Sequence, residues 1–287
     1  MKKKKILITG QGSYVGTNFI KWLKQWPNQY MVSEISVRGE GWKNEDFSKY
    51  DSVIHVAGIA HVSTEPKMEK QYYNVNRDLT IEVAEFAKEQ GIKQFIFMSS
   101  IIVYGDGTKD RRVIDRDTLP NPSNFYGNSK LQAEEGLKYL EDRNFKISVI
   151  RPPMIYGKNS KGNYPKLSKI AKLLPVFPEY ENQRSMLHVD NLSEFIKKLV
   201  DNNESGLFFP QNAEYVKTSD LVKEISTVHN KKIFMVKTFN PLIKVLIKRI
   251  NIINKVFGNL VYDQNISVYK ENYRVRDLSE SVRVTEK

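Results

Sequence analysis

Residues 5–16 read KILITGQGSYVG, and this stretch decides the fold. An apolar run ends at Thr9, a glycine-rich turn follows, and an apolar-faced segment comes next. A buried strand that leads into such a turn and then a helix is typical of dinucleotide binding. The glycines let the backbone approach a pyrophosphate, and the helix N-terminus favours its charge. A tight turn without a ligand is the alternative. We expect cofactor contacts from Gly10, Gly12, Ser13, Tyr14, Val15 and Gly16.

Beyond this turn, strand-like and helix-like segments alternate to about residue 157. The patterns predict strands at 5–9, 31–37, 52–57, 94–99 and 146–151, and helices at 15–25, 78–90 and 126–143. Alternation of this kind favours an α/β fold with a doubly wound parallel sheet of the Rossmann type. We therefore predict a dinucleotide-binding domain over 1–157 and a smaller C-terminal substrate-binding region over 158–287. A helix at 189–202 is expected to pack back on the first domain.

Tyr126 and Lys130 stand four residues apart on the third predicted helix, so their side chains share a face. A lysine ammonium beside a phenol lowers the phenol pKa from about 10, which would let Tyr126 exchange a proton near neutral pH. Two solvated residues on a helix surface are the alternative interpretation.

Ser100 follows the predicted strand 94–99, at the carboxyl end where ligands bind in such sheets. Its hydroxyl is placed to hold the substrate oxygen that Tyr126 protonates. Serine also caps helices and turns, which is the other reading of this position. The order of strand end, tyrosine and lysine favours catalytic roles for Ser100, Tyr126 and Lys130.

These segments together resemble the extended short-chain dehydrogenase/reductase superfamily, in its NAD-dependent epimerase/dehydratase family and the UDP-glucose 4-epimerase or UDP-4-keto-sugar reductase branch. The resemblance covers nearly the whole chain. Its motifs, in order, are residues 9–16, 51–58, Asn76, 99–105, the pair Tyr126 and Lys130, 151–157 and 184–192.

The resemblance implies further site residues and a homodimer. Cofactor contacts are implied for Ala57, Gly58, Asn76, Ser99, Pro152, Tyr126 and Lys130. Substrate contacts are implied for Ser100, Tyr126 and Arg184, where Arg184 meets the nucleotide diphosphate. The dimer would use a bundle of two helices from each subunit, including the one that carries Tyr126.

Two positions bear on the cofactor. The family usually has glycine where this chain has Ser13, and serine disfavours the positive φ that glycine tolerates, so we expect a remodelled turn. Arg38 lies where the second strand is predicted to end, and an arginine there suits the 2′-phosphate of NADP. Glu34 would instead favour the ribose hydroxyls of NAD if the strand ends earlier. We predict NADP, with NAD as the alternative.

The resemblance also limits the reaction. Related 4,6-dehydratases carry an acidic pair just after the serine, where this chain has Ile101 and Ile102, which argues against dehydration. We predict an NAD(P)-dependent 4-ketoreductase acting on a UDP-4-keto-6-deoxy-N-acetylhexosamine in surface-polysaccharide precursor synthesis. A UDP-hexose or UDP-N-acetylhexosamine 4-epimerase is the alternative. A non-catalytic NADP-binding sensor is a third reading, although such relatives typically lack the tyrosine or the lysine.

Composition sets the remaining bounds. The net charge of +12 is scattered and no nucleic-acid motif appears, so we expect a nucleotide-sugar partner and no nucleic acid. The chain has no cysteine, and its four histidines (His55, His61, His188 and His229) have no ligand spacing, so we expect no metal. The N-terminus lacks a signal-peptide pattern and no stretch is long and apolar enough to span a membrane, which favours a cytoplasmic protein.

Residues 241–257 combine many apolar residues with Lys244, Lys248, Arg249 and Lys255. Such a segment suits either an anionic membrane surface or the core of the substrate region. Because most stretches of this kind face a core, we expect the second.

Overall fold

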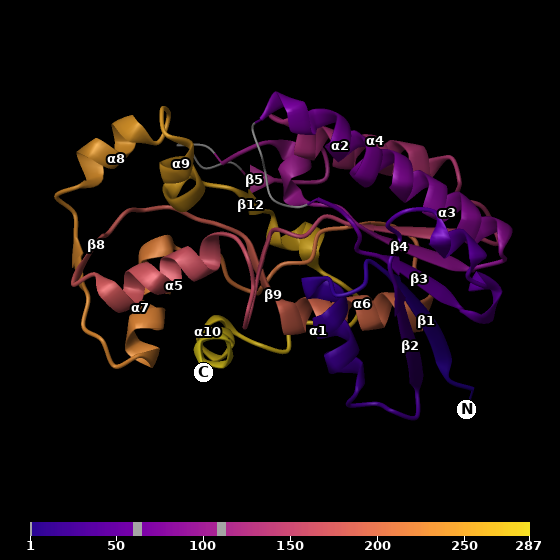
Figure 1. The fold of residues 1–287 in the computed structure, drawn as a ribbon. Helices are drawn as coiled ribbons and strands as arrows, with labels where there is room; N and C mark the ends of the chain where they lie inside the picture. The colour runs from indigo at the N-terminus through magenta and orange to yellow at the C-terminus, as the bar shows by residue number, and fades with distance from the viewer. Residues whose placement is uncertain (1, 60–64, 108–112) are drawn as a thin grey trace. The chain divides into compact units, whose positions relative to one another are not determined.

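The computed structural model describes residues 2–59, 65–107 and 113–287 (Figure 1). Its contacts divide the chain into two compact units. Unit 1 comprises Met1–Gly105, Pro120–Pro152 and Leu192–Phe209, and unit 2 comprises Asp106–Leu119, Pro153–Asn191 and Pro210–Lys287. The substrate-binding role assigned to 158–287 stays a prediction.

Unit 1 is built on one six-stranded sheet in which every neighbouring pair is parallel. Its strands are β1 (Lys4–Thr9), β2 (Tyr30–Ile35), β3 (Ser52–His55), β4 (Gln94–Met98), β6 (Lys146–Ile150) and β10 (Gly206–Phe208). They lie in the order β10-β6-β4-β3-β1-β2. The predicted parallel α/β sheet is therefore confirmed.

The strand order reverses between β1 and β3. The chain passes from β1 to its neighbour β2 on one side and then crosses to β3 on the other. In open α/β sheets the crevice at the carboxyl ends of two such strands is where ligands bind. The segments that follow β1 and β3 begin at Gly10 and Val56, so the glycine turn lies at this point.

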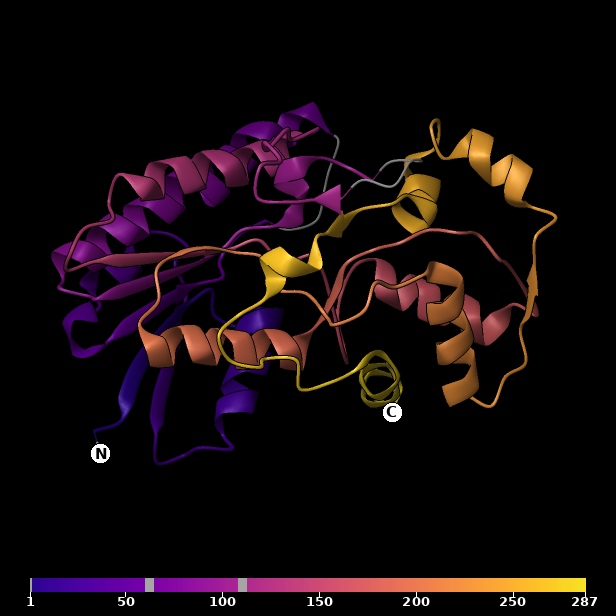
Figure 2. The same cartoon turned by 180° about the vertical axis from the view of Figure 1, so that it is seen from behind.

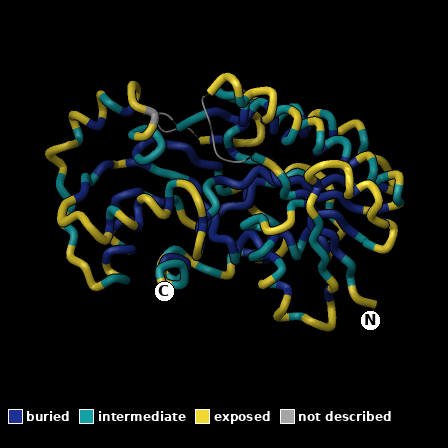
Figure 3. Tube along the Cα trace, in the orientation of Figure 1, coloured by how far each residue is buried: buried dark blue, intermediate teal, exposed yellow. Residues whose placement is uncertain are grey.

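Helices cover both faces of the sheet (Figures 1 and 2). On one face lie α2 (Glu69–Tyr73), α3 (Leu79–Glu89) and α4 (Phe125–Lys138); on the other lie α1 (Tyr14–Leu23) and α6 (Val189–Asn202). The two faces explain the apolar runs of the strands, since every residue of β3 and β4 is buried (Figure 3). Leu7 joins the core cluster with α3 and α4, while Ile8 faces α1.

The elements depart from the sequence predictions in several places. β2 ends at Ile35 rather than at residue 37. α4 ends at Lys138 rather than at 143, because the Asp142 carboxylate accepts the backbone N–H groups of Asn144 and Phe145 and forms a turn there. The sixth strand, β10, was not predicted, since three residues beginning with a glycine give no periodic pattern.

Unit 2 consists of short strand pairs and helices. Its strands are β5 (Val113–Ile114), β7 (Met154–Tyr156), β8 (Val176–Pro178), β9 (Met186–His188), β11 (Phe234–Val236) and β12 (Val261–Tyr262). Its helices are α5 (Asn163–Leu173), α7 (Thr218–Val228), α8 (Asn240–Leu246), α9 (Asn251–Phe257) and α10 (Leu278–Glu286). One apolar cluster, which includes Tyr164, Phe177, Leu221 and Val282, forms its core.

The described part of the chain has no helix that is long and apolar enough to cross a bilayer.

Candidate active site

The glycine turn brings β1 against the segment after β3. Gly10 has a φ of +118°, and a Cβ on it would stand 2.7 Å from the backbone nitrogen of Ala57. The N–H groups of Val56 and Ala57 both donate to the Thr9 carbonyl. Only glycine therefore fits this close approach of two backbones. The turn leaves a cradle of the kind that admits a pyrophosphate.

Ser13 does not strain the turn as the sequence suggested. Its φ is −65°, and its hydroxyl caps α1 by accepting the Gly16 N–H at 3.1 Å. The positive φ values fall on Gly10 and Gly12. Gly16 has its own reason to be glycine, since a Cβ there would lie 3.0 Å from the Ile8 side chain and push α1 away from the sheet. Tyr14 and Val15 are the half-buried first residues of α1.

The end of β2 carries both residues that bear on cofactor choice. The Glu34 carboxylate accepts the Gly12 N–H at 3.2 Å, which places this acid at the glycine turn. Arg38 is exposed and lies three residues beyond the end of the strand, with its own N–H donated to the Ser36 hydroxyl. The earlier strand end is the condition under which Glu34 was expected to serve NAD.

Ser100 and Tyr126 meet at the carboxyl end of β4. Ser100 caps the 3₁₀ turn η5 (Ile101–Tyr104), and its hydroxyl accepts the Ile102 N–H at 3.3 Å. The same hydroxyl interacts with the Tyr126 phenol and acts to lower its pKa. The capping role of Ser100 is thus confirmed, and its expected hydrogen bond to the substrate oxygen stays a prediction. Tyr126 is buried in the first turn of α4, beside Tyr72.

The electrostatics of this pair differ from the sequence expectation. Burial raises the pKa of Tyr126 to about 12, and the Ser100 hydrogen bond opposes this only in part. Lys130 donates instead to the Met98 carbonyl at 3.0 Å and lies over the Phe97 ring. Burial lowers the pKa of Lys130 to about 8. The prediction that the ammonium lowers the phenol pKa is therefore wrong for this structure, because desolvation dominates both groups.

Asn76 holds the loop after β3 against α4. It lies in a π-helical segment, η4 (Asn74–Asp78), and is fully buried. Its amide accepts the Ile59 N–H at 2.8 Å and donates to the Ile59 carbonyl and the Ser129 hydroxyl. A Cβ on Gly58 would lie 2.9 Å from Asn76 and 3.2 Å from the Lys130 ammonium. Asn76 therefore fixes the backbone of Ile59, the residue after Gly58, and the hydroxyl of Ser129, the residue before Lys130.

Arg184 belongs to unit 2 and is half-buried there. Its Nη1 donates to the Gly258 carbonyl at 2.9 Å, and burial lowers the pKa of its guanidinium to about 10 against the opposing charge of Asp106. It lines a small cavity with Met154, Met186, Val216 and Lys255. A half-buried cation at a cavity wall suits an anionic group such as a diphosphate.

Comparison with known proteins identifies the family. Residues 6–208 match the model of the NAD dependent epimerase/dehydratase family. The chain belongs to this family. Membership confirms the resemblance and makes the chain an NAD(P)-dependent enzyme of nucleotide-sugar metabolism, of the epimerase or reductase type. Its cofactor is a nicotinamide dinucleotide.

Three similar proteins illustrate the range of the family. A UDP-glucose 4-epimerase of Vibrio cholerae is 30% identical over 79% of this chain and 76% of its own length. An N-acetyl-α-D-glucosaminyl-diphospho-ditrans,octacis-undecaprenol 4-epimerase of Escherichia coli O157:H7 is 30% identical over 79% of this chain and 73% of its own. The crystal structure of a dTDP-4-dehydrorhamnose reductase from Clostridium acetobutylicum shares the fold, with a TM-score of 0.75, 20% identity and 97% coverage of both chains.

One buried network of this family member was missed from the sequence. Both carboxylate oxygens of Glu134 accept hydrogen bonds from the Arg151 guanidinium, which also donates to the Tyr104 hydroxyl at 2.6 Å. The Ser99 hydroxyl donates to Glu134 as well. The network joins the ends of β4 and β6 to α4. Helical spacing held the clue, since Glu134 lies four residues after Lys130.

Two predicted cofactor contacts lie next to this network. Ser99 is buried and directed to Glu134, and the Pro152 carbonyl accepts the Ile101 N–H at 2.9 Å. Both residues thus fix the segment that carries Ser100. Direct contacts of Ser99, Pro152 and Asn76 with a dinucleotide stay predictions.

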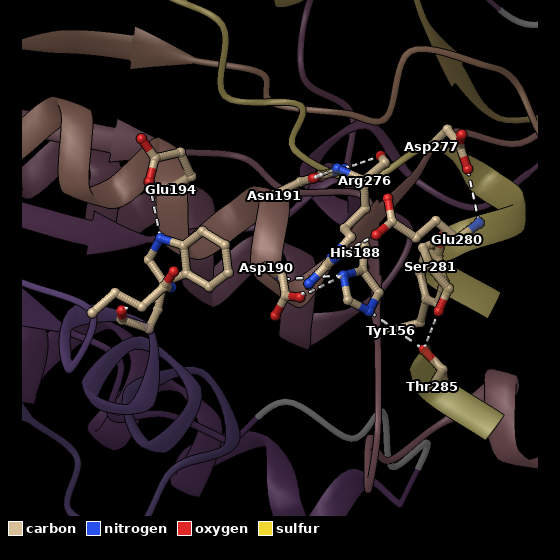
Figure 4. Close-up of polar contacts among 12 residues, drawn as sticks. Tyr156, His188, Asp190, Asn191, Glu194, Arg276, Asp277, Glu280, Ser281 and Thr285 are labelled. Carbon is tan, nitrogen blue, oxygen red and sulfur yellow. Dashed lines mark hydrogen bonds and ion pairs between the residues drawn. The ribbon is translucent and has the colours of Figure 1, made fainter. Parts of the chain in front are cut away.

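Two histidines serve as buried connectors. His55 bridges the hydroxyls of Thr9 and Thr80 at 2.8 and 3.1 Å, and burial lowers its pKa to about 3. In unit 2, His188 accepts the Asp190 N–H through Nδ1 at 3.2 Å, and burial lowers its pKa to about 4 (Figure 4).

His229 lies in unit 2, where its Nε2 contacts the Glu286 carboxylate at 2.7 Å. His61 lies outside the described residues. No cluster of histidines and carboxylates suited to a metal ion occurs over residues 2–59, 65–107 and 113–287.

Proposed function

We propose that the chain is an NADPH-consuming 4-ketoreductase that acts on a UDP-4-keto-6-deoxy-N-acetylhexosamine in the synthesis of surface-polysaccharide precursors. The observation that carries the proposal is the interaction of the Ser100 hydroxyl with buried Tyr126, with buried Lys130 on the same helix as Tyr126. This arrangement supplies one proton donor and one further hydroxyl for a single carbonyl oxygen.

Each part of the site would have its own role in reducing the carbonyl group. The glycine turn at Gly10 and Gly12, together with the N-terminus of α1, would hold the dinucleotide, and the dinucleotide supplies the hydride when bound. Ser100 holds the carbonyl oxygen, and Tyr126 gives it a proton as negative charge develops there. Lys130, buried on the same helix as Tyr126, would contact the nicotinamide ribose. Arg184 of unit 2 would bind the diphosphate.

Two further observations favour reduction. A phenol whose pKa is about 12 keeps its proton at neutral pH, which is the state that a proton donor needs before the reaction. A 4-epimerase must first remove a proton from a hydroxyl group, so its tyrosine must begin as a base. Arg38, exposed beyond the end of β2, supports selection of the 2′-phosphate of NADP.

A 4-epimerase acting on UDP-hexose or UDP-N-acetylhexosamine is the second candidate. It is supported by the two 4-epimerases that are 30% identical to this chain. The contact of Glu34 with the glycine turn also favours NAD, the cofactor that an epimerase keeps bound. A sensor without chemistry is less well supported, because Tyr126 and Lys130 are both present.

The test mixes the purified protein with NADPH and a UDP-4-keto-6-deoxy-N-acetylhexosamine and follows the absorbance of the reduced nicotinamide. Loss of NADPH in proportion to the ketosugar supports the reductase. No loss of NADPH, with interconversion of a UDP-sugar and its C4 epimer seen by NMR without added cofactor, would establish the epimerase instead. Arg38→Ala should weaken NADPH binding and leave NADH binding unchanged if Arg38 reads the 2′-phosphate.

A further inference from the structure

The chain carries a long segment with cations and no acids. Between Glu224 and Asp263 no aspartate or glutamate occurs. The same segment contains seven cationic residues, against a net charge of +12 for the whole chain: Lys231, Lys232, Lys237, Lys244, Lys248, Arg249 and Lys255. The positive charge is thus concentrated in one part of unit 2.

Only some of the apolar side chains in the middle of this segment are buried in the core of unit 2. Ile243, Ile247 and Phe257, from α8, the turn after it and α9, are buried in the unit 2 core. The expectation that residues 241–257 pack on their own unit is confirmed for these side chains. Core packing does not account for the apolar side chains of this stretch that are exposed.

Ile253 and Val256 are half-buried against the same core, whereas five other large apolar side chains of this segment face water. Their exposed fractions are 56% for Leu242, 54% for Val245 and 59% for Ile252, and Phe239 and Ile250 are also exposed. Figure 3 shows this exposure along α8, whose place is marked in Figure 1. We call the set the apolar-basic surface: Phe239, Leu242, Lys244, Val245, Lys248, Arg249, Ile250 and Ile252.

The cations of this surface form no ion pairs with acidic residues in the described part of the chain. Among the described residues, no ion pair involves Lys244, Lys248 or Arg249, whereas Lys217 of the same unit contacts Glu179 and Glu181. Exposed apolar side chains are ordinary when scattered singly. Five of them within fourteen residues, interleaved with unpaired cations, form a patch that water solvates poorly.

We propose that the apolar-basic surface docks the chain on an anionic phospholipid membrane. Interfacial segments combine large apolar side chains, which enter the acyl boundary, with lysine and arginine, which meet anionic headgroups. A nucleic acid would match the cations but not Leu242, Val245 and Ile252. The association is peripheral, since α8 and α9 have seven residues each and a span needs about 20. The proposal does not depend on which sugar reaction the chain performs.

The test is flotation of the full chain with two kinds of vesicle. One is pure phosphatidylcholine, and the other holds equal parts of phosphatidylcholine and phosphatidylglycerol. We expect binding to the anionic vesicles that weakens as salt is raised. The triple change Lys244→Gln, Lys248→Gln and Arg249→Gln should weaken it roughly a hundredfold, since each cation near such a surface contributes about 1 kcal/mol. Leu242→Ser with Val245→Ser should weaken it at least tenfold through lost apolar burial.

Matched controls use exposed residues elsewhere. Lys21→Gln, Lys24→Gln and Lys138→Gln remove the same charge from unit 1. Leu119→Ser with Val268→Ser removes two exposed apolar side chains that are 82% and 70% exposed. Both controls should bind anionic vesicles as the unmodified chain does, and circular dichroism should show all variants folded.

Three results would overturn the proposal. The first is failure of the unmodified chain to float with anionic vesicles. The second is equal loss of binding in the control variants, which would show a general charge effect. The third is absence of vesicle binding together with a dimer, seen by sedimentation, that Leu242→Ser and Val245→Ser dissociate. That result would assign the surface to a second copy of the chain.

Discussion

Glu134→Gln tests whether the buried network beneath Ser100 and Lys130 supports the site. The Arg151 guanidinium donates to both oxygens of the Glu134 carboxylate, at 3.1 Å from Nε and 2.5 Å from Nη2. The two side chains are only 7% and 8% exposed. Removing one partner of such a pair leaves a buried charge uncompensated, at a cost of about 3–5 kcal/mol. Because glutamine keeps one acceptor, we expect a loss of about 3 kcal/mol in the free energy of unfolding.

The same substitution should change the pH dependence of the reaction. Burial lowers the pKa of Lys130, and the negative charge of Glu134 raises it again in part. Without that charge the pKa of Lys130 falls below its present value of about 8. The ammonium then loses its proton at a lower pH. The alkaline limb of the rate profile should therefore move to lower pH in Glu134→Gln.

The assay combines urea unfolding with a pH profile of kcat/KM. Glu135→Gln is the matched control, because Glu135 is exposed on the same helix. The double variant Glu134→Gln with Arg151→Met should lose less unfolding free energy than the sum of the losses in the two single variants, because each single change already breaks the pair. The reasoning is refuted if Glu134→Gln unfolds at the same urea concentration as Glu135→Gln and keeps the same alkaline limb.

Three further predictions concern Lys130, Gly10 and the buried histidines. Lys130→Met should abolish turnover. In the unmodified chain, the unfolding free energy should rise between about pH 8 and about pH 10.4, because the folded state loses the Lys130 proton at lower pH than the unfolded state. Urea unfolding should show that the variant lacks this rise. Gly10→Ala should abolish dinucleotide binding in a fluorescence titration, because the added Cβ meets the Ala57 backbone. Gly91→Ala is the control: Gly91 also has a positive φ of +79° but nothing lies near its added Cβ, so binding should persist. Equal loss of binding in both variants would contradict the contact argument. His55 and His188 have pKa values lowered to about 3 and about 4, so below about pH 6.5 these histidines bind protons in the unfolded chain before they do so in the folded chain. The unfolding free energy should therefore fall by about 2 kcal/mol per histidine from pH 7 to pH 5. An unfolding free energy that does not change over this pH range would contradict the prediction.

Much of unit 1 was predictable because its strands are buried on both faces. Such strands read as continuous apolar runs, and β1, β3, β4 and β6 lie within two residues of their predicted ends. The glycine turn was equally readable, since Gly10 and Gly16 are required by close backbone and side-chain approaches. The strand order is a tertiary property, which the sequence alone did not specify.

The missing parts of the site depend on tertiary burial. The pKa of Tyr126 rises because the surrounding protein removes water from it, and no spacing rule contains that information. Ser13 acts as a helix cap, an arrangement that becomes visible only when its φ of −65° is known. The ion pair of Glu134 with Arg151 joins two residues that are 17 positions apart in the sequence. Only the position of Glu134 on the face of Lys130 was readable beforehand.

The most direct test of the central claim is turnover of Tyr126→Phe, measured beside its affinity for the dinucleotide. If Tyr126 transfers the proton at the sugar oxygen, turnover should fall by about 10²–10⁴-fold while dinucleotide binding stays near that of the unmodified chain. Serine at position 100 is retained in this variant, so its hydrogen bond to the substrate oxygen remains available. Turnover equal to that of the unmodified chain would contradict the account.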